Sequence, residues 1–415
     1  FRRRRGYDLV RLLPVFSGRI VESPEVTERF LWDLRRTIAD LFSENYAGHM
    51  AALAARHGLN LELEPYGNAP SDDLHYGGPA QVPLGEFWIE KGVDTCSRLA
   101  ASIGHTNGRK VIGAEAFTAG SGGGNKWELD PFAMKPLGDA IFCAGINRFE
   151  LHSFVHQPWL NRAPGMTLAA VGTHFDRNVT WFEPGAAWMR YLARCQALLR
   201  QGLFVADVAY FPGEGVPTSM YGGNLKLPAL PAGHEFDACS ADVILNRMSV
   251  RDGRLALPDG MSYHALVLAG TETITLPLLR KLKQLAENGG RIFGPKPVKS
   301  PGLAGFPTVD AEVRRMADEL WGGGKIGAIA PLPEVIRALG LKPDFEVANA
   351  DAKLTYIHRT IGDAEVYFVA SPKPSAQEAN CTFRVSGRAP ELWHPDTGRM
   401  ERVALRAPFT TVVDY

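Results

Sequence analysis

Short apolar segments alternate with helical stretches over residues 1–205, and these segments end in polar, aromatic or histidine residues. Ser23 and Gly58 flank an amphipathic helical stretch as its expected ends. The apolar segments that follow it are "LNLELEPYGN", "RKVIGAEAF", "NRFELHSFVHQ" and "TLAAVGTHFDRN". Parallel α/β barrels assemble their active sites at the carboxyl ends of their strands. The pattern therefore predicts an α/β fold with a (β/α)8-type catalytic barrel, present in part, whose start we expect upstream of Phe1.

The pattern changes twice after residue 205. An apolar segment, "YHALVLAG", a helical stretch, "LPLLRKLKQLAENGG", and a further apolar segment, "RIFGP", follow one another. This order predicts a doubly wound, flavodoxin-like βαβ domain over residues 206–345. The segments "AEVYFVASP", "CTFRVSG" and "PFTTVVDY" are typical of antiparallel strands, and they predict a β-sandwich over residues 346–415.

The composition narrows the class of partner. Lysine and arginine together number 45, as do aspartate and glutamate, which removes the main electrostatic reason to expect nucleic acid or an anionic membrane. No apolar run reaches the roughly 18 residues of a membrane-spanning helix. The five cysteines form no CxxC pair and predict buried thiols. We expect a carbohydrate or another small neutral substrate, and a periplasmic or secreted location only if an export signal lies upstream.

A basic cluster, Arg2–Arg5, opens the chain and is followed by Gly6. Such a run could mark a nucleic-acid contact. The simpler interpretation is the solvated end of a helix that stops at the glycine.

Glu115 ends the apolar segment "RKVIGAEAF" and is followed by a glycine-rich loop, Gly120–Gly124. The loop lacks both the Gly-Lys-Ser/Thr of a phosphate-binding loop and the G-x-G-x-x-G of a dinucleotide site. A carboxylate at the end of a barrel strand is well placed to be a general acid or base. A structural ion pair with an arginine is the alternative for Glu115.

Three further glutamates have comparable settings: Glu64, Glu86 and Glu150. Hydrolysis of a glycosidic bond needs one protonated and one ionised carboxyl group, so more than one of these residues is required. Their spacing along the chain does not show which two face each other. Glu150 lies between Phe149 and Leu151, and it could equally be a structural partner of Arg148.

Aromatic residues and histidines accompany these carboxylates: Trp88, Trp127, His152, His156, Trp159, His174 and Trp181. Sugar rings have apolar faces and many hydroxyl groups, so their sites combine flat aromatic rings with polar donors. A single tryptophan is more often part of a core, but a group of this size favours a pocket. No G-x-S-x-G elbow or H-E-x-x-H zinc motif is present.

The sequence resembles glycoside hydrolase family 106, the α-L-rhamnosidases. The resemblance covers most of residues 1–220, in the segments "RRRGYDL", "ERFLWDLRRTIADLFSENY", "AEAFT", "INRFELHSFVHQPW" and "PGMTLAAVGTHFDRNVTWFEPGAAWMRYL". It implies a (β/α)8 barrel, inversion of configuration, and a calcium ion that contacts the sugar hydroxyls and whose ligands are not assigned. An acidic motif of the family, similar to "DE-x-x-W-P-S-G", lies upstream of "RRGYDL" and is outside this sequence.

Within this resemblance, Glu115 in "AEAFT" and Glu86 in "LGEFW" match the active-site glutamates, so they are the predicted catalytic pair. The predicted substrate-binding residues are Glu64, Trp127, His152, His156, Trp159, His174 and Trp181. Two other functions stay open: a β-galactosidase-like enzyme, which shares the order of barrel and flavodoxin-like domain, and a degenerate hydrolase homologue that only binds carbohydrate.

Overall fold

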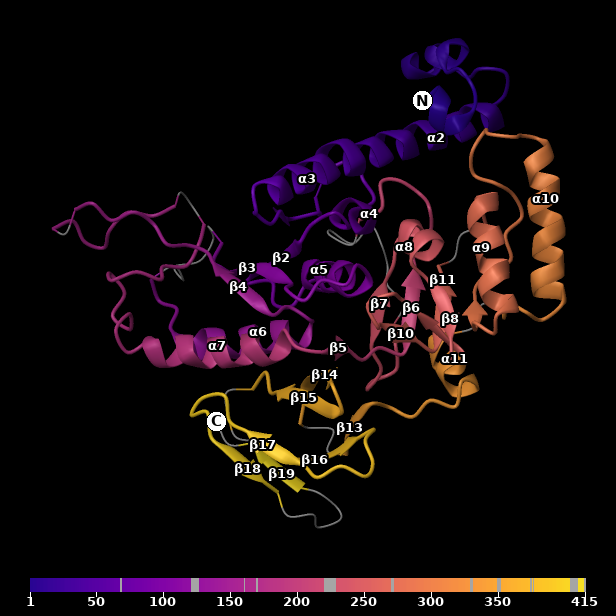
Figure 1. Cartoon of the computed structure of the whole chain (residues 1–415). Coiled ribbons are helices and arrows are strands. Elements are labelled where there is room, and N and C mark those ends of the chain that lie inside the picture. The colour runs from indigo at the N-terminus through magenta and orange to yellow at the C-terminus, as the bar shows by residue number, and fades with distance from the viewer. Residues whose placement is uncertain are drawn as a thin grey trace.

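The computed structural model describes residues 1–67, 69–120, 127–159, 161–168, 171–219, 229–269, 272–328, 331–348, 352–373, 375 and 377–403, with the backbone of 410–413. Its helices and strands form three groups along the chain, each built around its own sheets (Figure 1).

The first sheet is parallel, as the sequence pattern predicts for this part of the chain, and has the strand order β1-β2-β3-β4. The strand over residues 82–88 was not among the predicted segments, and the predicted segment "TLAAVGTHFDRN" contains no strand among its described residues. Its strands are β1 (Glu62–Leu63), β2 (Val82–Trp88), β3 (Gly113–Thr118) and β4 (Arg148–Leu151). The helices that connect and follow these strands are α4 (Asp73–Gly77), α5 (Thr95–Thr106), α6 (Pro131–Cys143) and α7 (Ala186–Leu199).

Helices precede this sheet. They are α1 (Arg2–Arg5), a 3-10 segment (Val10–Ser17), α2 (Pro24–Phe42), a π-helical turn (Ser43–Gly48) and α3 (His49–Arg56). The Ser23 side chain accepts a hydrogen bond from the Val26 backbone N–H at 3.1 Å, which confirms the predicted cap. Gly6 ends α1 with φ of 78°, and Arg5 binds Asp40 of α2 at 2.8 Å. Arg5, the last residue of the basic cluster, is therefore held against α2 by an ion pair.

The two faces of the first sheet differ in chemistry. One face is apolar, with Phe87, Ala114 and Phe117 fully buried and packed in a core with residues of α6 and α7. The other face carries charged residues, among them Arg148 of β4 and Glu62 of β1, which bind each other at 2.6 Å. Neighbouring strands lie about 4.8 Å apart, so contact between the two outermost strands means that the sheet curls with this charged face inside.

Gly113 on β3 leaves room on the concave face for side chains of the neighbouring strands β2 and β4. A Cβ atom on Gly113 would lie 2.2 Å from Leu84 Cδ2 and 3.5 Å from Glu150 Oε1. The neighbouring side chains therefore occupy the space that a side chain on Gly113 would need.

The second group contains another parallel sheet, of order β12-β11-β6-β7. Its strands are β6 (Val208–Phe211), β7 (Phe236–Ala238), β11 (Ala265–Leu268) and β12 (Ile292–Phe293). The helices of this group are α8 (Ala241–Asn246), α9 (Leu276–Glu287), α10 (Thr308–Ala317) and α11 (Leu332–Ala338). A π-helical turn (Asp318–Gly322) follows α10 directly. A small antiparallel sheet accompanies them, formed by β8 (Ser249–Arg251), β9 (Arg254–Ala256) and β10 (Ser262–Tyr263).

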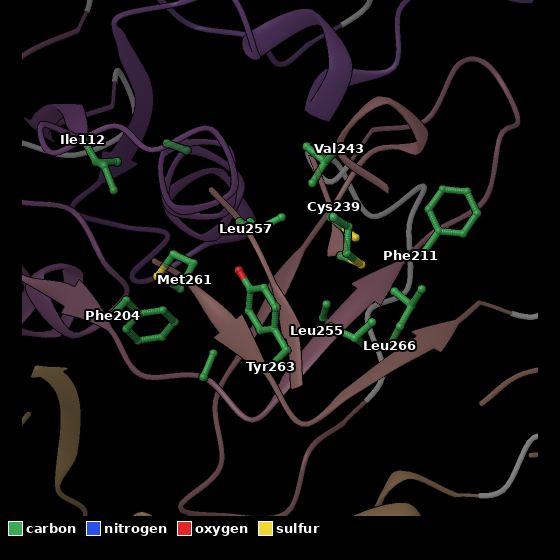
Figure 2. Close-up of a cluster of buried hydrophobic side chains, with 14 of the residues drawn as sticks. Ile112, Phe204, Phe211, Cys239, Val243, Leu255, Leu257, Met261, Tyr263 and Leu266 are labelled. Carbon is green, nitrogen blue, oxygen red and sulfur yellow. The ribbon is translucent and has the colours of Figure 1, made fainter. Parts of the chain in front are cut away.

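One hydrophobic core continues from the first group into the second. Figure 2 shows Tyr263, which is fully buried, surrounded by side chains from both groups, including Ile112, Phe204 and Leu266. The Tyr263 hydroxyl donates to Asp237 at 2.9 Å, which satisfies its polar end inside the core.

The third group is antiparallel, as predicted for the end of the chain. Its strands are β13 (Phe345–Val347), β14 (Thr355–Ile361), β15 (Ala364–Ala370), β16 (Gln377–Phe383), β17 (Glu391–Trp393), β18 (Met400–Arg402) and β19 (Thr410–Val413). Strand β5 (Leu203–Phe204), which follows α7, pairs with β14. The predicted domain limits at residues 205 and 345 stay predictions, and these two positions lie beside β5 and within β13.

All five cysteines are free thiols, and four of them are buried, as the sequence predicts. Among the residues that the structure describes, no helix combines the length and the hydropathy that a membrane span needs.

Candidate active site

The register of the first sheet places three glutamates in one row. Glu86 on β2 pairs with Glu115 on β3, and Glu115 pairs with Glu150 on β4. Residues paired in register on parallel strands project to the same face, so all three side chains belong to the concave face. Glu86 and Glu150 lie in the carboxyl-terminal half of their strands, and Glu115 is the third of the six residues of β3. Barrel enzymes place their catalytic groups at the carboxyl ends of the strands.

Glu115 is held by two neighbours. The Thr118 hydroxyl donates to Glu115 Oε1 at 2.7 Å, and His152 Nδ1, just after β4, lies 3.3 Å from the same oxygen. Thr118 Oγ1 and His152 Nδ1 are 3.1 Å apart, which closes a compact group of three side chains. The Glu115 side chain is 31% exposed, so it is anchored on one side and open on the other.

Glu64 follows β1 and faces the same group. The pKa of the Glu64 carboxyl is raised, mainly by burial. The negative charges of Glu115 and Glu86 raise this pKa further, and a hydrogen bond with Tyr66 lowers it. The register of β1 with β2 continues to Glu64, which follows Glu62 by two residues and so shares the concave face with Glu86 and Glu115. Carboxylates that share a small site are favourable for acid and base roles, because repulsion keeps one of them protonated.

Glu150 has a different neighbourhood. It lies 3.3 Å from Arg148 on its own strand, and Arg148 also binds Glu62. Burial raises the pKa of the Glu150 carboxyl, the charge of Glu62 and a hydrogen bond with it add to the rise, and Arg148 opposes it. The alternative that makes Glu150 a structural partner of Arg148 is therefore confirmed.

Trp127 and His174 meet across two loops. Their rings are stacked with centroids 3.6 Å apart and an interplanar angle of 12°. His174 is buried, while Trp127 is partly exposed and keeps an open edge. The predicted glycine-rich loop ends just before Trp127, and its residues 121–126 lie outside the described residues. Gly120, which is described, donates its backbone N–H to Glu90 Oε1 at 2.9 Å.

The remaining predicted residues lie along the segment between β4 and α7. His156 is exposed. Trp159 is 54% exposed, and the Arg162 guanidinium lies 5.7 Å from its ring centroid. Trp159 and Arg162 line a hollow of about 190 Å³. Trp181 instead packs in the core, where its Nε1–H donates to the Leu129 carbonyl at 2.7 Å.

The structure thus brings Glu64, Glu86, Glu115 and His152 together, and it pairs Trp127 with His174. Thr118 was missed in the sequence, because strict alternation along a strand puts it on the opposite face from Glu115. Tyr66 was also missed, although it follows Glu64 by two residues in "ELEPYG".

The resemblance to the rhamnosidases implies a calcium ion, and the concave face has the oxygen-rich side chains that calcium prefers. Within the described ranges, however, no three His, Cys, Asp or Glu side chains are arranged so that they could hold a metal ion. Calcium also binds backbone and amide carbonyl oxygens, so a calcium ion on this face stays a prediction.

Comparison with known proteins identifies the family of the chain. The family model for alpha-L-rhamnosidase, glycoside hydrolase family 106, matches residues 1–407. A rhamnosidase from Novosphingobium sp. PP1Y has a similar structure, with a TM-score of 0.90 and 32% identity over 100% of this chain and 41% of that one.

Two other relatives extend the comparison. A protein from Formosa agariphila named "Putative beta-glucuronidase" is 38% identical over 404 residues, which are 97% of this chain and 34% of that protein. A GH42 beta-galactosidase, Gan42B, matches with a TM-score of 0.58 and 10% identity over 100% of this chain and 73% of that one, which shows similarity of fold alone. The chain spans 34% of the curated relative's length.

The match of the family model over nearly the whole chain, together with the close structural match to a rhamnosidase, shows that this chain belongs to glycoside hydrolase family 106.

Proposed function

We propose that the protein hydrolyses the bond to a terminal α-L-rhamnose unit, with inversion, by a mechanism that uses two carboxyl groups. The observation that supports this best is the register of Glu86 with Glu115 on adjacent parallel strands. Strands about 4.8 Å apart bring two such carboxyl groups to one sugar unit. Inversion is proposed from the family resemblance and not from this spacing, because inverting enzymes hold their two carboxyl groups about 6.5–9.5 Å apart.

The proposed chemistry assigns one carboxyl to each side of the bond. A protonated carboxyl gives its proton to the glycosidic oxygen as the bond from that oxygen to the anomeric carbon breaks. An ionised carboxylate takes a proton from water, whose oxygen forms the new bond to the anomeric carbon. Glu115 and Glu86 fill these roles, or position the water, and the Thr118 hydroxyl holds Glu115 by a hydrogen bond of 2.7 Å.

The sugar would lie against Trp127, His174 and His152, with Glu64 as a hydrogen-bonding partner. The stacked Trp127 ring offers a flat apolar surface of the kind that binds the faces of sugars. The exposed side chains of His156 and Trp159 would contact more distant parts of the substrate. Trp181 is the weakest candidate for the sugar pocket, because its ring packs against the hydrophobic core.

We also propose the finer architecture. The curled parallel sheet of β1 to β4 would be part of a (β/α)8-type barrel over residues 1–205. The order β7-β6-β11-β12 is typical of a flavodoxin-like sheet, here assigned to residues 206–345, and a β-sandwich segment would occupy 346–415. Calcium remains a proposal of the family resemblance, and it would be held by oxygen ligands near the sugar.

Release of p-nitrophenol from p-nitrophenyl α-L-rhamnoside tests this function. Glu115→Gln preserves the shape of the side chain and removes its charge, so we expect a loss of kcat of roughly 10²–10⁴-fold. Glu334→Gln, at an exposed position of α11, is the matched control and should keep full activity. Parallel reactions with added calcium and with a chelator test the proposed ion.

Three results would decide against the proposal. Activity of Glu115→Gln within a few-fold of wild type would remove Glu115 from the catalytic role. Cleavage of aryl β-galactoside or β-glucuronide instead of rhamnoside would assign a different sugar, and the glucuronide is included because of the name of the Formosa relative. Rhamnose binding without cleavage of any of these glycosides would favour the binding-only homologue.

A further inference from the structure

Strand β3 contains an irregularity beside the candidate catalytic residue. Glu86 pairs with Glu115, but Trp88 pairs with Thr118, so two steps along β2 correspond to three steps along β3. An extra residue of this kind is a β-bulge, which redirects the side chains that follow it. Phe117 lies in the bulge with φ of 60°, a backbone conformation that bulky residues rarely adopt.

The bulge exchanges the faces of two side chains. In a regular strand Phe117 would share the face of Glu115, and Thr118 would point to the opposite side. Here Phe117 is fully buried and its ring packs in the core, 4.8 Å from Phe87 and 5.4 Å from Phe149 between centroids. Thr118 therefore comes onto the concave face, where its hydroxyl reaches Glu115.

The segment after β4 holds the bulge in place. The Thr173 hydroxyl donates to the Phe117 carbonyl at 2.6 Å, and the Gly172 backbone N–H donates to the Ala119 carbonyl at 2.8 Å. Thr173 is fully buried, so these bonds are shielded from water. The unusual conformation at Phe117 is thus fixed by contacts from a second part of the chain.

The protons available on Thr118 and His152 decide which group donates in each of their hydrogen bonds. An ionised carboxylate only accepts, so the single hydroxyl proton of Thr118 is donated to Glu115. The contact of 3.1 Å with His152 then requires His152 Nδ1 to carry a proton and to donate it to Thr118 Oγ1. Thr118 consequently fixes the orientation of both the carboxylate and the imidazole ring.

We propose that Thr118 is a positioning residue for hydrolysis, placed by the Phe117 bulge so that it orients Glu115 and His152. This inference rests on the proposed function, in which Glu115 is a catalytic carboxylate. The charged and titratable groups that face Glu115 are Glu86 from β2, Glu64 after β1, Glu150 from β4 and His152 after β4. All of them remain unchanged when Thr118 alone is replaced.

The test compares Thr118→Val, which has a similar shape but no hydroxyl, with Thr118→Ser, which keeps the hydroxyl. We expect Thr118→Val to lower kcat for the aryl rhamnoside by about 10- to 100-fold with KM changed much less, because the carboxylate is no longer held. Its acidic limb of activity should move to higher pH, since a donor to the carboxylate is lost. Thr118→Ser should restore the wild-type kcat and pH profile to within about threefold.

The controls separate the possible failures. If Glu115→Gln is inactive while Thr118→Val has wild-type kcat and pH profile, the positioning role is wrong and the catalytic assignment stands. If Glu115→Gln is active, the catalytic assignment itself is wrong. Should Thr118→Val fail to fold by circular dichroism, Thr118→Ala replaces it in the same comparison.

A second readout does not depend on turnover. In protein labelled with ¹³C at the glutamate carboxyl carbons, the signal of Glu115 is identified by its loss in Glu115→Gln. We expect its chemical shift at a fixed pH to differ from wild type in Thr118→Val, because the hydroxyl donor is lost, and to match wild type in Thr118→Ser. An equal chemical shift in wild type and Thr118→Val would overturn the proposal.

Discussion

Glu150 on the concave face lowers the stability of the folded protein at neutral pH. Glu150 shares Arg148 with Glu62, so two carboxylates depend on one guanidinium group. Burial and the charge of Glu62 raise the pKa of Glu150 above its unfolded value. The folded protein therefore binds this proton more tightly than the unfolded chain, and the contribution of Glu150 to stability falls as pH rises through its raised pKa.

Glu150→Gln should remove this dependence. A glutamine needs no ionisation, so we expect the variant to have a higher Tm than wild type at pH 7–8, by roughly 1–3 °C, and the difference to disappear near pH 4. Calorimetry across this pH range measures the effect, with Glu334→Gln as the exposed control. An equal Tm for Glu150→Gln and wild type at every pH would contradict the prediction.

At the scale of elements, the position of β2 depends on how closely α5 approaches it. A Cβ atom on Gly85 would lie 2.9 Å from the Cys96 carbonyl oxygen and 3.2 Å from the Ser97 Cα atom. Both atoms belong to the backbone at the start of α5, which cannot move aside as a flexible side chain can. Because Glu86 follows Gly85 directly, this contact also determines where the proposed catalytic carboxyl lies.

Gly85→Ala should therefore destabilise the protein and disturb the site together. We expect a loss of about 1–3 kcal/mol in the free energy of unfolding, measured by urea denaturation, with a lower kcat for the rhamnoside. Gly215→Ala is the matched control, since a Cβ atom there meets nothing within 4 Å. Equal stability of the two variants would show that α5 and β2 can separate without penalty.

In the whole molecule, buried charges join the second and third groups of elements. Arg384 after β16 binds Asp207 before β6 at 2.9 Å and lies 3.3 Å from Asp344 before β13. His234 binds Asp207 at 2.5 Å, and His358 binds Asp344 at 2.9 Å. The Asp207 side chain is 2% exposed, so its charge depends on these partners rather than on water.

The carboxyl of Asp207 should therefore give the protein acid sensitivity. Burial alone raises the pKa of Asp207, but hydrogen bonds from His234 and Arg384 outweigh it and hold the pKa below its usual range. Its stabilising contribution is thus present above the unfolded pKa of about 3.9 and is lost as pH falls through the lower folded value.

Asp207→Asn should lower the free energy of unfolding by roughly 1–3 kcal/mol at pH 7, because it removes the buried carboxylate that binds Arg384 and His234, while the partly exposed Arg384 keeps Asp344 as a partner. The deficit should shrink as pH falls below the unfolded value and through the lower folded pKa, where the wild-type carboxylate is protonated as well. Urea denaturation at several pH values measures it. Asp363→Asn, whose side chain is 96% exposed, should leave stability unchanged. A deficit that stays constant with pH would contradict this explanation.

Local patterns in the sequence determined much of this protein. The features predicted from it are the cap at Ser23, the helix end at Gly6, the parallel strands that carry Glu115 and Glu150, the antiparallel strands near the end of the chain and the membership of family 106. These features depend on neighbours a few residues apart, whose periodicity and turn chemistry are written directly in the chain.

Only the tertiary structure decided which distant residues meet. The pairing of Glu86 with Glu115, the contact of Arg148 with Glu62, and the pairing of β5 with β14 all depend on strand register and sheet curvature. Thr118 shows the physical reason most clearly. Regular alternation along β3 would place Thr118 on the opposite face from Glu115. A bulge held by a segment some 55 residues later reverses that placement. The burial of Phe117 and the hydrogen bond to its backbone outweigh the local preference of the strand.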